Sequence, residues 1–129
     1  MTSSKDRKAW EQRPNEPNPA YVAFVLFASL GPDRESIVKS GTGKSLWEML
    51  MAGLERMDDT APLPAVCEVI IHTLKNMLEK NLLDHLDKDD ENYAFVEQFH
   101  EGLQKAPVLK DQMNNMISNL EKLKRGEKL

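Results

Sequence analysis

Apolar residues recur along most of this chain of 129 residues at steps of three and four, which is the period of an α-helix. The pattern contains no run of alternating β-branched residues that would indicate a strand. It therefore predicts an all-α fold, a compact bundle of five to six helices in a single domain. The expected helices cover residues 19–30, 32–39, 45–57, 64–86, 91–105 and 108–125.

The longest apolar run, residues 20–30, forms most of the first expected helix. Asn18 is a residue type that caps helices, and Pro19 suits the first helical position, where its missing N–H costs nothing. Gly31 and Pro32 end the helix. Apolar residues occupy nearly every side of this segment, so we expect it to be buried on more than one face or to form an interface.

Aromatic residues make the same region a candidate partner-binding surface. Trp10 lies in a charged, proline-containing arm, residues 1–17, that we expect to be extended and partly flexible. Burying a tryptophan removes a large apolar area from water, so Trp10 should pack either on the body of the protein or on a partner. The candidate partner-binding residues are Trp10, Tyr21, Phe24 and Phe27.

The last expected helix carries an apolar seam with the four-three spacing of two heptads. Such a seam fits either packing inside the bundle or an interface between subunits, and the spacing does not separate the two. The candidate oligomerisation residues are Leu109, Met113, Met116, Leu120 and Leu123. The helical domain is expected to span residues 18–125, followed by a tail at 126–129.

The segment 41–45, GTGKS, ends like a phosphate-binding loop. That loop requires a glycine where this chain has Val38, so a nucleotide site is not expected and the segment is interpreted as a turn between helices. Ser45 and Glu48 then have the spacing of a capping box, which predicts that the third helix begins at Ser45.

Neither a cofactor nor a metal site is predicted, and the chain is not expected to be an enzyme. An EF-hand loop beginning at Asp87 would need glycine and glutamate where the chain has Asn92 and Gln98. The three histidines, residues 72, 85 and 100, do not have the spacing of metal ligands.

The net charge of −4 is unevenly distributed. Residues 1–13 and 121–129 each hold four basic and two acidic residues, so the body between them is strongly acidic. An acidic body is not typical of a general nucleic-acid-binding protein. The single cysteine, Cys67, cannot form an internal disulfide, and an apolar run of eleven residues is shorter than the roughly 20 that span a bilayer. We therefore expect a cytoplasmic protein without membrane contact.

Residues 10–36 resemble the opening of small phage-type helix-turn-helix proteins, including small terminase subunits. The resemblance comes from W-E-x-x-P-x-E beginning at Trp10, A-Y-x-A-F beginning at Ala20, and G-P-x-R beginning at Gly31. With a loosely similar tail at 120–127 it covers about a quarter of the chain. The resemblance implies a phage or prophage context. The chain departs from the family after Ser36. The expected helix at residues 45–57 has Arg56 as its only basic residue, so it lacks the basic character of a recognition helix.

The sequence thus predicts a non-catalytic protein that binds other proteins, as an adaptor, assembly factor or inhibitor, and that also forms a homo-oligomer. The alternative is a DNA-binding or DNA-packaging subunit resembling the small terminases. Its candidate contacts are the basic residues near the two ends, Lys5, Arg7, Lys8, Arg13, Lys122, Lys124 and Arg125.

Overall fold

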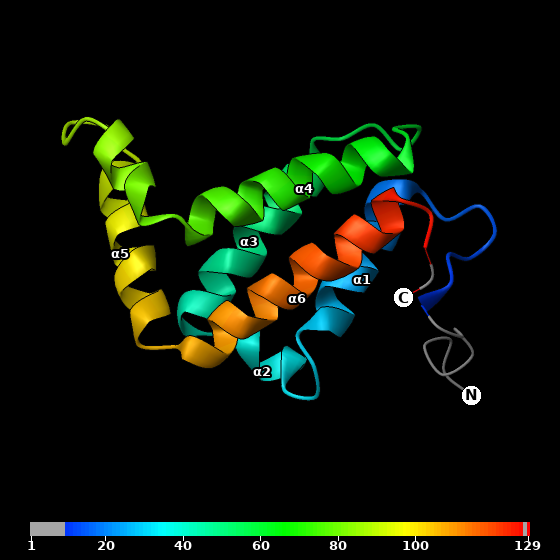
Figure 1. The fold of residues 1–129 in the computed structure, drawn as a ribbon, viewed down its shortest axis with the longest axis horizontal. Helices are drawn as coiled ribbons and strands as arrows, with labels where there is room; N and C mark the ends of the chain where they lie inside the picture. Colours follow the sequence, from blue (N-terminus) through cyan, green and yellow to red (C-terminus); the bar gives the residue numbers. More distant parts are fainter. Residues whose placement is uncertain (1–9, 128) are drawn as a thin grey trace.

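The computed structural model describes residues 10–127 and 129, with the backbone alone for residues 80–82. This part of the chain forms six α-helices and no strand (Figure 1). The predicted all-α bundle in a single domain is therefore confirmed. The helices are α1 (Asn18–Ser29), α2 (Arg34–Ile37), α3 (Gly41–Glu55), α4 (Leu63–Leu78), α5 (Tyr93–Gln104) and α6 (Pro107–Lys124), with a 3₁₀ segment η2 (Lys80–His85) after α4.

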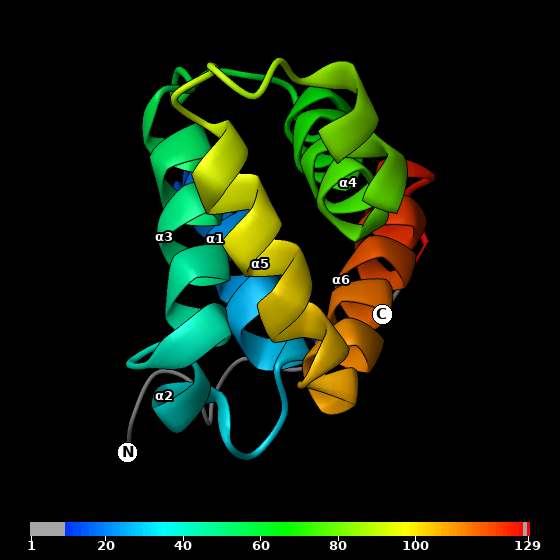
Figure 2. The same cartoon turned by 90° about the vertical axis from the view of Figure 1, so that its left-hand side faces the viewer.

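Helices α4 and α6 lie side by side and run in opposite directions, and this pair has the most extensive contact in the bundle (Figure 1). Helix α1 contacts α3, α4 and α6, and Figure 2 shows it between α3 and α6. Helix α5 packs on α3. The core is built from apolar side chains of α1, α3, α4 and α6 that are almost completely buried, such as Val22, Leu26, Leu50, Ile70, Leu74, Met113 and Leu120.

The start of α1 differs from the prediction. The residue before the helix is Pro17, and Asn18 is the first helical residue, so Asn18 does not cap it. Its side-chain amide instead donates a hydrogen bond of 2.7 Å to the carbonyl oxygen of Ala61, which ties α1 to the loop before α4. Tertiary contact has replaced local capping at this position.

The end of α1 is fixed to α6 by two polar contacts. Gln112 Nε2 donates to the carbonyl oxygen of Leu30 at 2.6 Å, which satisfies one carbonyl left open at the end of the helix. Ser29 is buried; its Oγ donates to the Val25 carbonyl at 2.7 Å and accepts from Asn119 Nδ2 at 2.9 Å. Gly31, with φ +82°, then turns the chain away in a conformation that suits glycine.

Helix α3 begins at Gly41, so the expected turn at 41–45 and the expected capping box at Ser45 were both wrong. The residue before the helix is Ser40, and Ser45 lies inside the helix. The reason is packing: a Cβ at Gly43 would lie 2.3 Å from the carbonyl oxygen of Ile37. The second glycine therefore allows α2 to press against the first turn of α3.

Three other boundaries differ from the expected ones. Helix α2 is confined to Arg34–Ile37, and α5 begins at Tyr93. Helix α4 ends at Leu78 and not at residue 86, because Glu79 has an extended backbone with ψ 120° before η2 begins. None of the helices in the described residues is both long enough and apolar enough to cross a membrane.

Candidate functional site

The apolar seam of α6 lies inside the bundle. Its five residues are between 0 and 9% exposed, packed within the core that α6 shares with α1 and α4. The seam is therefore the packing surface of α6 in its own chain, and in this fold a second copy cannot reach it. The assignment of a subunit interface to Leu109, Met113, Met116, Leu120 and Leu123 is corrected accordingly.

All four candidate partner-binding residues contact the protein itself: Tyr21 is buried, and Trp10, Phe24 and Phe27 are partly buried and pack against the core. Tyr21 is 5% exposed, and its hydroxyl donates a hydrogen bond to the carbonyl oxygen of Trp10. Trp10 is partly buried and packs against the core cluster. Trp10 was expected to pack either on the body of the protein or on a partner, and in this structure it packs on the body. Tyr21 does not offer its ring to a partner in this fold.

Phe27 is the centre of an aromatic contact that joins three elements. Its ring centroid lies 5.5 Å from that of Trp47 on α3, with the ring planes tilted by 54°. The guanidinium carbon of Arg34 on α2 lies 5.5 Å from the Phe27 centroid, a cation–π distance. Phe27 and Trp47 are both partly exposed.

Apart from Asn18, the residues of α1 that are not buried are all apolar. Of the six α-helices in the described part of the chain, α1 alone contains no charged residue. Ala20 is exposed, and the other outward residues of α1 are partly exposed. Trp47 and Met51, one turn apart on α3, extend this surface beside α1. We define the α1–α3 face as Ala20, Ala23, Phe24, Phe27 and Ala28 of α1 with Trp47 and Met51 of α3.

Sequence reasoning singled out Phe24 and Phe27 but missed Trp47 and Met51. The signal was present in the spacing of α3, whose buried residues Leu46, Leu50 and Leu54 form one stripe. Trp47 and Met51 lie one position beyond that stripe, on its flank. A wide apolar stripe on a helix indicates contact with a second neighbour or an exposed apolar surface, and here both apply.

The structure describes four of the seven basic residues named for the DNA-binding alternative. Lys5, Arg7 and Lys8 lie outside the described residues. Arg13 is exposed and Lys122 is partly buried. Lys124 and Arg125 are engaged by carboxylates, those of Glu68 and Glu127 respectively.

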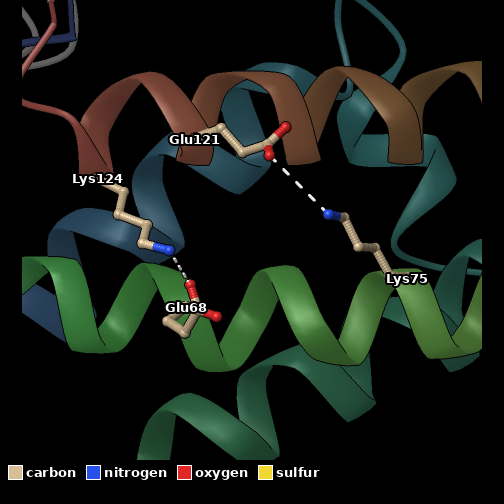
Figure 3. A network of polar contacts seen from close by, with 4 residues as sticks. All are labelled: Glu68, Lys75, Glu121 and Lys124. Carbon is tan, nitrogen blue, oxygen red and sulfur yellow. Dashed lines mark hydrogen bonds and ion pairs between the residues drawn. The ribbon is translucent and has the colours of Figure 1, made fainter.

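The Lys124–Glu68 pair is one of two ion pairs that lie side by side between α6 and α4 (Figure 3). Lys75 Nζ of α4 lies 3.9 Å from Glu121 Oε2 of α6, so each helix contributes one acid and one base. The hydrogen bond and charge of Lys124 lower the pKa of Glu68 below its ordinary value of 4.5. All four side chains remain well exposed, so these pairs orient α4 and α6 more than they stabilise them.

A buried cysteine and a cavity lie outside the α1–α3 face. Burial raises the pKa of the Cys67 thiol to about 11, which keeps it protonated and unreactive at neutral pH. A cavity of about 380 Å³ lies between α2 and the first turns of α3 and α6, lined by Asp33, Ile37, Thr42 and Val108 among others. Among the residues that the structure describes, no three His, Cys, Asp or Glu side chains are grouped so that they could hold a metal ion.

Comparison of the chain with known protein families, with curated proteins and with solved structures finds no match.

Proposed function

We propose that this chain is a non-catalytic helical protein that binds another protein through the α1–α3 face, as an adaptor, assembly factor or inhibitor. The observation that carries the proposal is the uncharged outward side of α1, where exposed alanine and partly exposed phenylalanine replace the charged residues of an ordinary surface helix. Apolar surface that is gathered in one place on a small protein marks a binding site more often than scattered apolar residues do.

The residue types on this face are those that contribute most to protein interfaces. Trp and Arg are enriched among the residues whose truncation costs most in binding, and Phe and Met are enriched at interfaces generally. Arg34, which lies over Phe27, supplies a cation at the edge of the apolar area. Hydrophobic residues with a charged rim form the usual anatomy of a specific interface.

The context proposed for this activity is a phage or prophage, in the cytoplasm of the host. The resemblance of residues 10–36 to phage-type helix-turn-helix proteins supports the first part. The free, buried Cys67 supports a reducing compartment.

The test uses the full chain, carrying an affinity tag, to capture its partner from cells that contain its natural source. The captured protein is identified and purified, and its dissociation constant is measured by calorimetry against three variants. Ala20→Lys and Phe27→Lys place a charge on the α1–α3 face, whereas Val69→Lys places the same charge on α4, at a side chain that is 49% exposed.

We expect Ala20→Lys and Phe27→Lys to weaken binding at least about 30-fold, as loss of a residue worth about 2 kcal/mol does. We expect Val69→Lys to bind as the unmodified chain does. Equal affinity for all three variants would show that the partner binds elsewhere. Circular dichroism of each variant confirms that the helices are retained.

The DNA-binding alternative has less support, because Lys124 and Arg125 already pair with carboxylates. It predicts a complex with duplex DNA that weakens steeply as salt rises from about 50 mM. A gel shift with the full chain, which includes Lys5, Arg7 and Lys8, tests it directly. A salt-sensitive complex would favour this alternative over the proposal above.

A further inference from the structure

We propose that a groove between α3 and α5 binds a cationic amphipathic segment of another protein, in which lysine or arginine residues flank an apolar side chain. The inference goes beyond the proposed function, because it concerns a different surface. Thr42, which lines the groove, and Met51 of the α1–α3 face are nine positions apart on α3, which is about two and a half turns. The two surfaces therefore lie on opposite sides of α3.

The α3–α5 groove opens beside a close contact between the two helices. Gly102 of α5 has no side chain and packs against Thr42 in the first turn of α3. The groove begins one turn earlier on α5, at Gln98. It has a volume of about 340 Å³ and is lined by Gly41, Thr42, Ser45, Phe95, Gln98 and Phe99. That volume lies in the range of pockets that bind small ligands, about 300–1,000 Å³, so the groove has room for a side chain of a partner.

Phe95 gives the groove an apolar wall that stays in contact with water. Its side chain is 38% exposed, and it is the one aromatic residue among the exposed large apolar side chains of the described chain. Its ring stacks on the ring of Phe99, with 6.4 Å between the centroids and 13° between the planes. Phe99 is 5% exposed and belongs to the core, so it holds the Phe95 ring in place. A ring that is already fixed loses little conformational entropy when a partner covers it.

The negative charge of the chain is concentrated on α5 and the segment before it. Residues 83–104 hold seven acidic residues and Lys88 as the only basic one. Their net charge of −6 exceeds the −4 of the whole chain, so the remaining residues carry a net charge of +2. All seven carboxylates are exposed, and within the described residues none of them pairs with a lysine or an arginine. Figure 1 shows α5 at the opposite end of the molecule from the C-terminus, so the segment forms an acidic end of the protein.

Two of these carboxylates belong to the same helix as Phe95, next to the groove. Glu101 follows Gln98 by three positions on α5, a spacing that places both residues on the same side of the helix. Glu97 lies one turn before Glu101. On the other wall, the lining residues of α3 are uncharged, and their neighbour Lys44 is paired with Glu48 at 3.7 Å. The groove therefore combines an apolar wall with a negative edge.

A cationic segment is the occupant that this charge selects. Nucleic acids and anionic membranes carry the same sign of charge and are repelled. Two copies of this chain that met here would bring together two segments that each have a net charge of −6. A segment with lysine or arginine around an apolar side chain matches both features, because the apolar side chain packs against Phe95 while the cations face Glu97 and Glu101. Such complementary charge speeds association and disfavours partners of the wrong sign.

The experiment titrates the full chain, up to about 1 mM, into a fluorescent peptide and measures its anisotropy. The peptide has about 15 residues of lysine and leucine, patterned as an amphipathic helix. We expect a complex that weakens as salt rises from about 50 to about 200 mM, since salt screens exposed charges. A peptide with serine in place of leucine keeps the charge and should bind at least about tenfold more weakly, because it has no side chain for the apolar wall.

Two variants of α5 with the same change of charge locate the peptide. Gln98→Lys places a cation in the groove and should weaken binding at least about tenfold. Gln104→Lys is the matched control, since Gln104 is also exposed on α5 but does not line the groove, and it should change the affinity no more than about twofold. Phe95→Ser removes the apolar wall and should also weaken binding at least about tenfold. Circular dichroism confirms the fold of each variant.

Absence of a complex with the lysine–leucine peptide at about 1 mM would overturn the inference. Equal affinity of Gln98→Lys and Gln104→Lys would overturn it as well, and so would equal binding of the leucine and serine peptides, because charge alone would then explain the complex. A peptide with glutamate in place of lysine that binds more tightly would contradict the sign of the occupant. Ala20→Lys should bind the peptide as the unmodified chain does. Loss of binding in Ala20→Lys alone would place the peptide on the α1–α3 face, which overturns the inference and leaves the proposed function standing.

Discussion

Thr42 of α3 lies so close to Gly102 of α5 that a Cβ on Gly102 would be 2.0 Å from the Thr42 Oγ1 atom. This contact holds the end of α5 against the first turn of α3, where the two helices run antiparallel. No side chain larger than hydrogen fits at position 102 unless Thr42 moves. The Gly-Thr-Gly segment that resembled a phosphate-binding loop therefore acts as a packing element.

The first prediction concerns this pair. Gly102→Ala should lower the free energy of unfolding by about 2 kcal/mol, because it overpacks a tight contact. Adding Thr42→Ala to the Gly102→Ala chain removes Oγ1. The free energy of unfolding of this double variant should be about 1 kcal/mol higher than the sum of the two single changes predicts. Recovery is partial because the Cβ of Thr42 would still lie 3.1 Å away. Urea denaturation measures all four chains. Strict additivity would contradict the close contact.

The second prediction compares two glycines of α3. Gly43→Ala should lower the free energy of unfolding by about 2 kcal/mol, because its Cβ meets the backbone of Ile37, which cannot rotate away. Gly53→Ala is the matched control, since its Cβ meets only Ile70 Cδ1 at an ordinary 3.8 Å. It should raise the free energy of unfolding by about 0.5 to 1 kcal/mol. The opposite signs distinguish a packing requirement from a general preference for glycine in α3.

The third prediction concerns the pH dependence of stability. The folded-state pKa of Glu68 is lowered by Lys124, so its contribution is fully present above the unfolded value of about 4.5 and is lost as pH falls through the folded value. Glu68→Gln should therefore flatten the loss of stability in acid. The effect should be small because both side chains are exposed.

Denaturant midpoints between about pH 6 and pH 3 measure this effect. The control is the same change in a Lys124→Gln background, where Glu68→Gln should no longer alter the pH dependence. An equal effect in both backgrounds would show that Lys124 is not the cause.

The fourth prediction concerns Cys67. Because burial holds the pKa of its thiol at about 11, the native protein should react with a disulfide reagent at pH 8 at least about 100-fold more slowly than the chain unfolded in urea. Absorbance of the released thiolate measures both rates. Rapid reaction of the native protein would mean that α4 opens readily around Cys67.

The helical period in the sequence was sufficient to predict the fold class and most of the core. Leu46, Leu50 and Leu54 share a face of α3, and the spacing of Met113, Met116 and Leu120 on α6 predicted their common burial. The period does not say which surface covers an apolar stripe. For that reason the α6 seam fitted packing within the chain and packing between chains equally well.

The errors arose where contacts between distant segments replaced local signals. Gly43 was interpreted as part of a turn because its helical role depends on Ile37, whose approach the sequence does not reveal. Asn18 was expected to cap α1, but its amide binds the carbonyl of Ala61, 43 positions away. The end of α4 was also wrong: the helix was expected to continue to residue 86, but the extended backbone at Glu79 ends it at Leu78.

The central claim is that another protein chain covers the α1–α3 face when this protein is bound to its partner. The most direct measurement is the NMR relaxation that a soluble paramagnetic agent causes at methyl groups of the full chain, alone and with the captured partner bound. Ala20, Val69 and Val108 are all exposed in the single chain. Without a bound protein, the agent should therefore broaden the methyl signals of all three residues alike. With the partner bound, we predict that Ala20 is protected while Val69 and Val108 remain accessible. Equal broadening of the three residues, both alone and with a captured partner bound, would contradict the account.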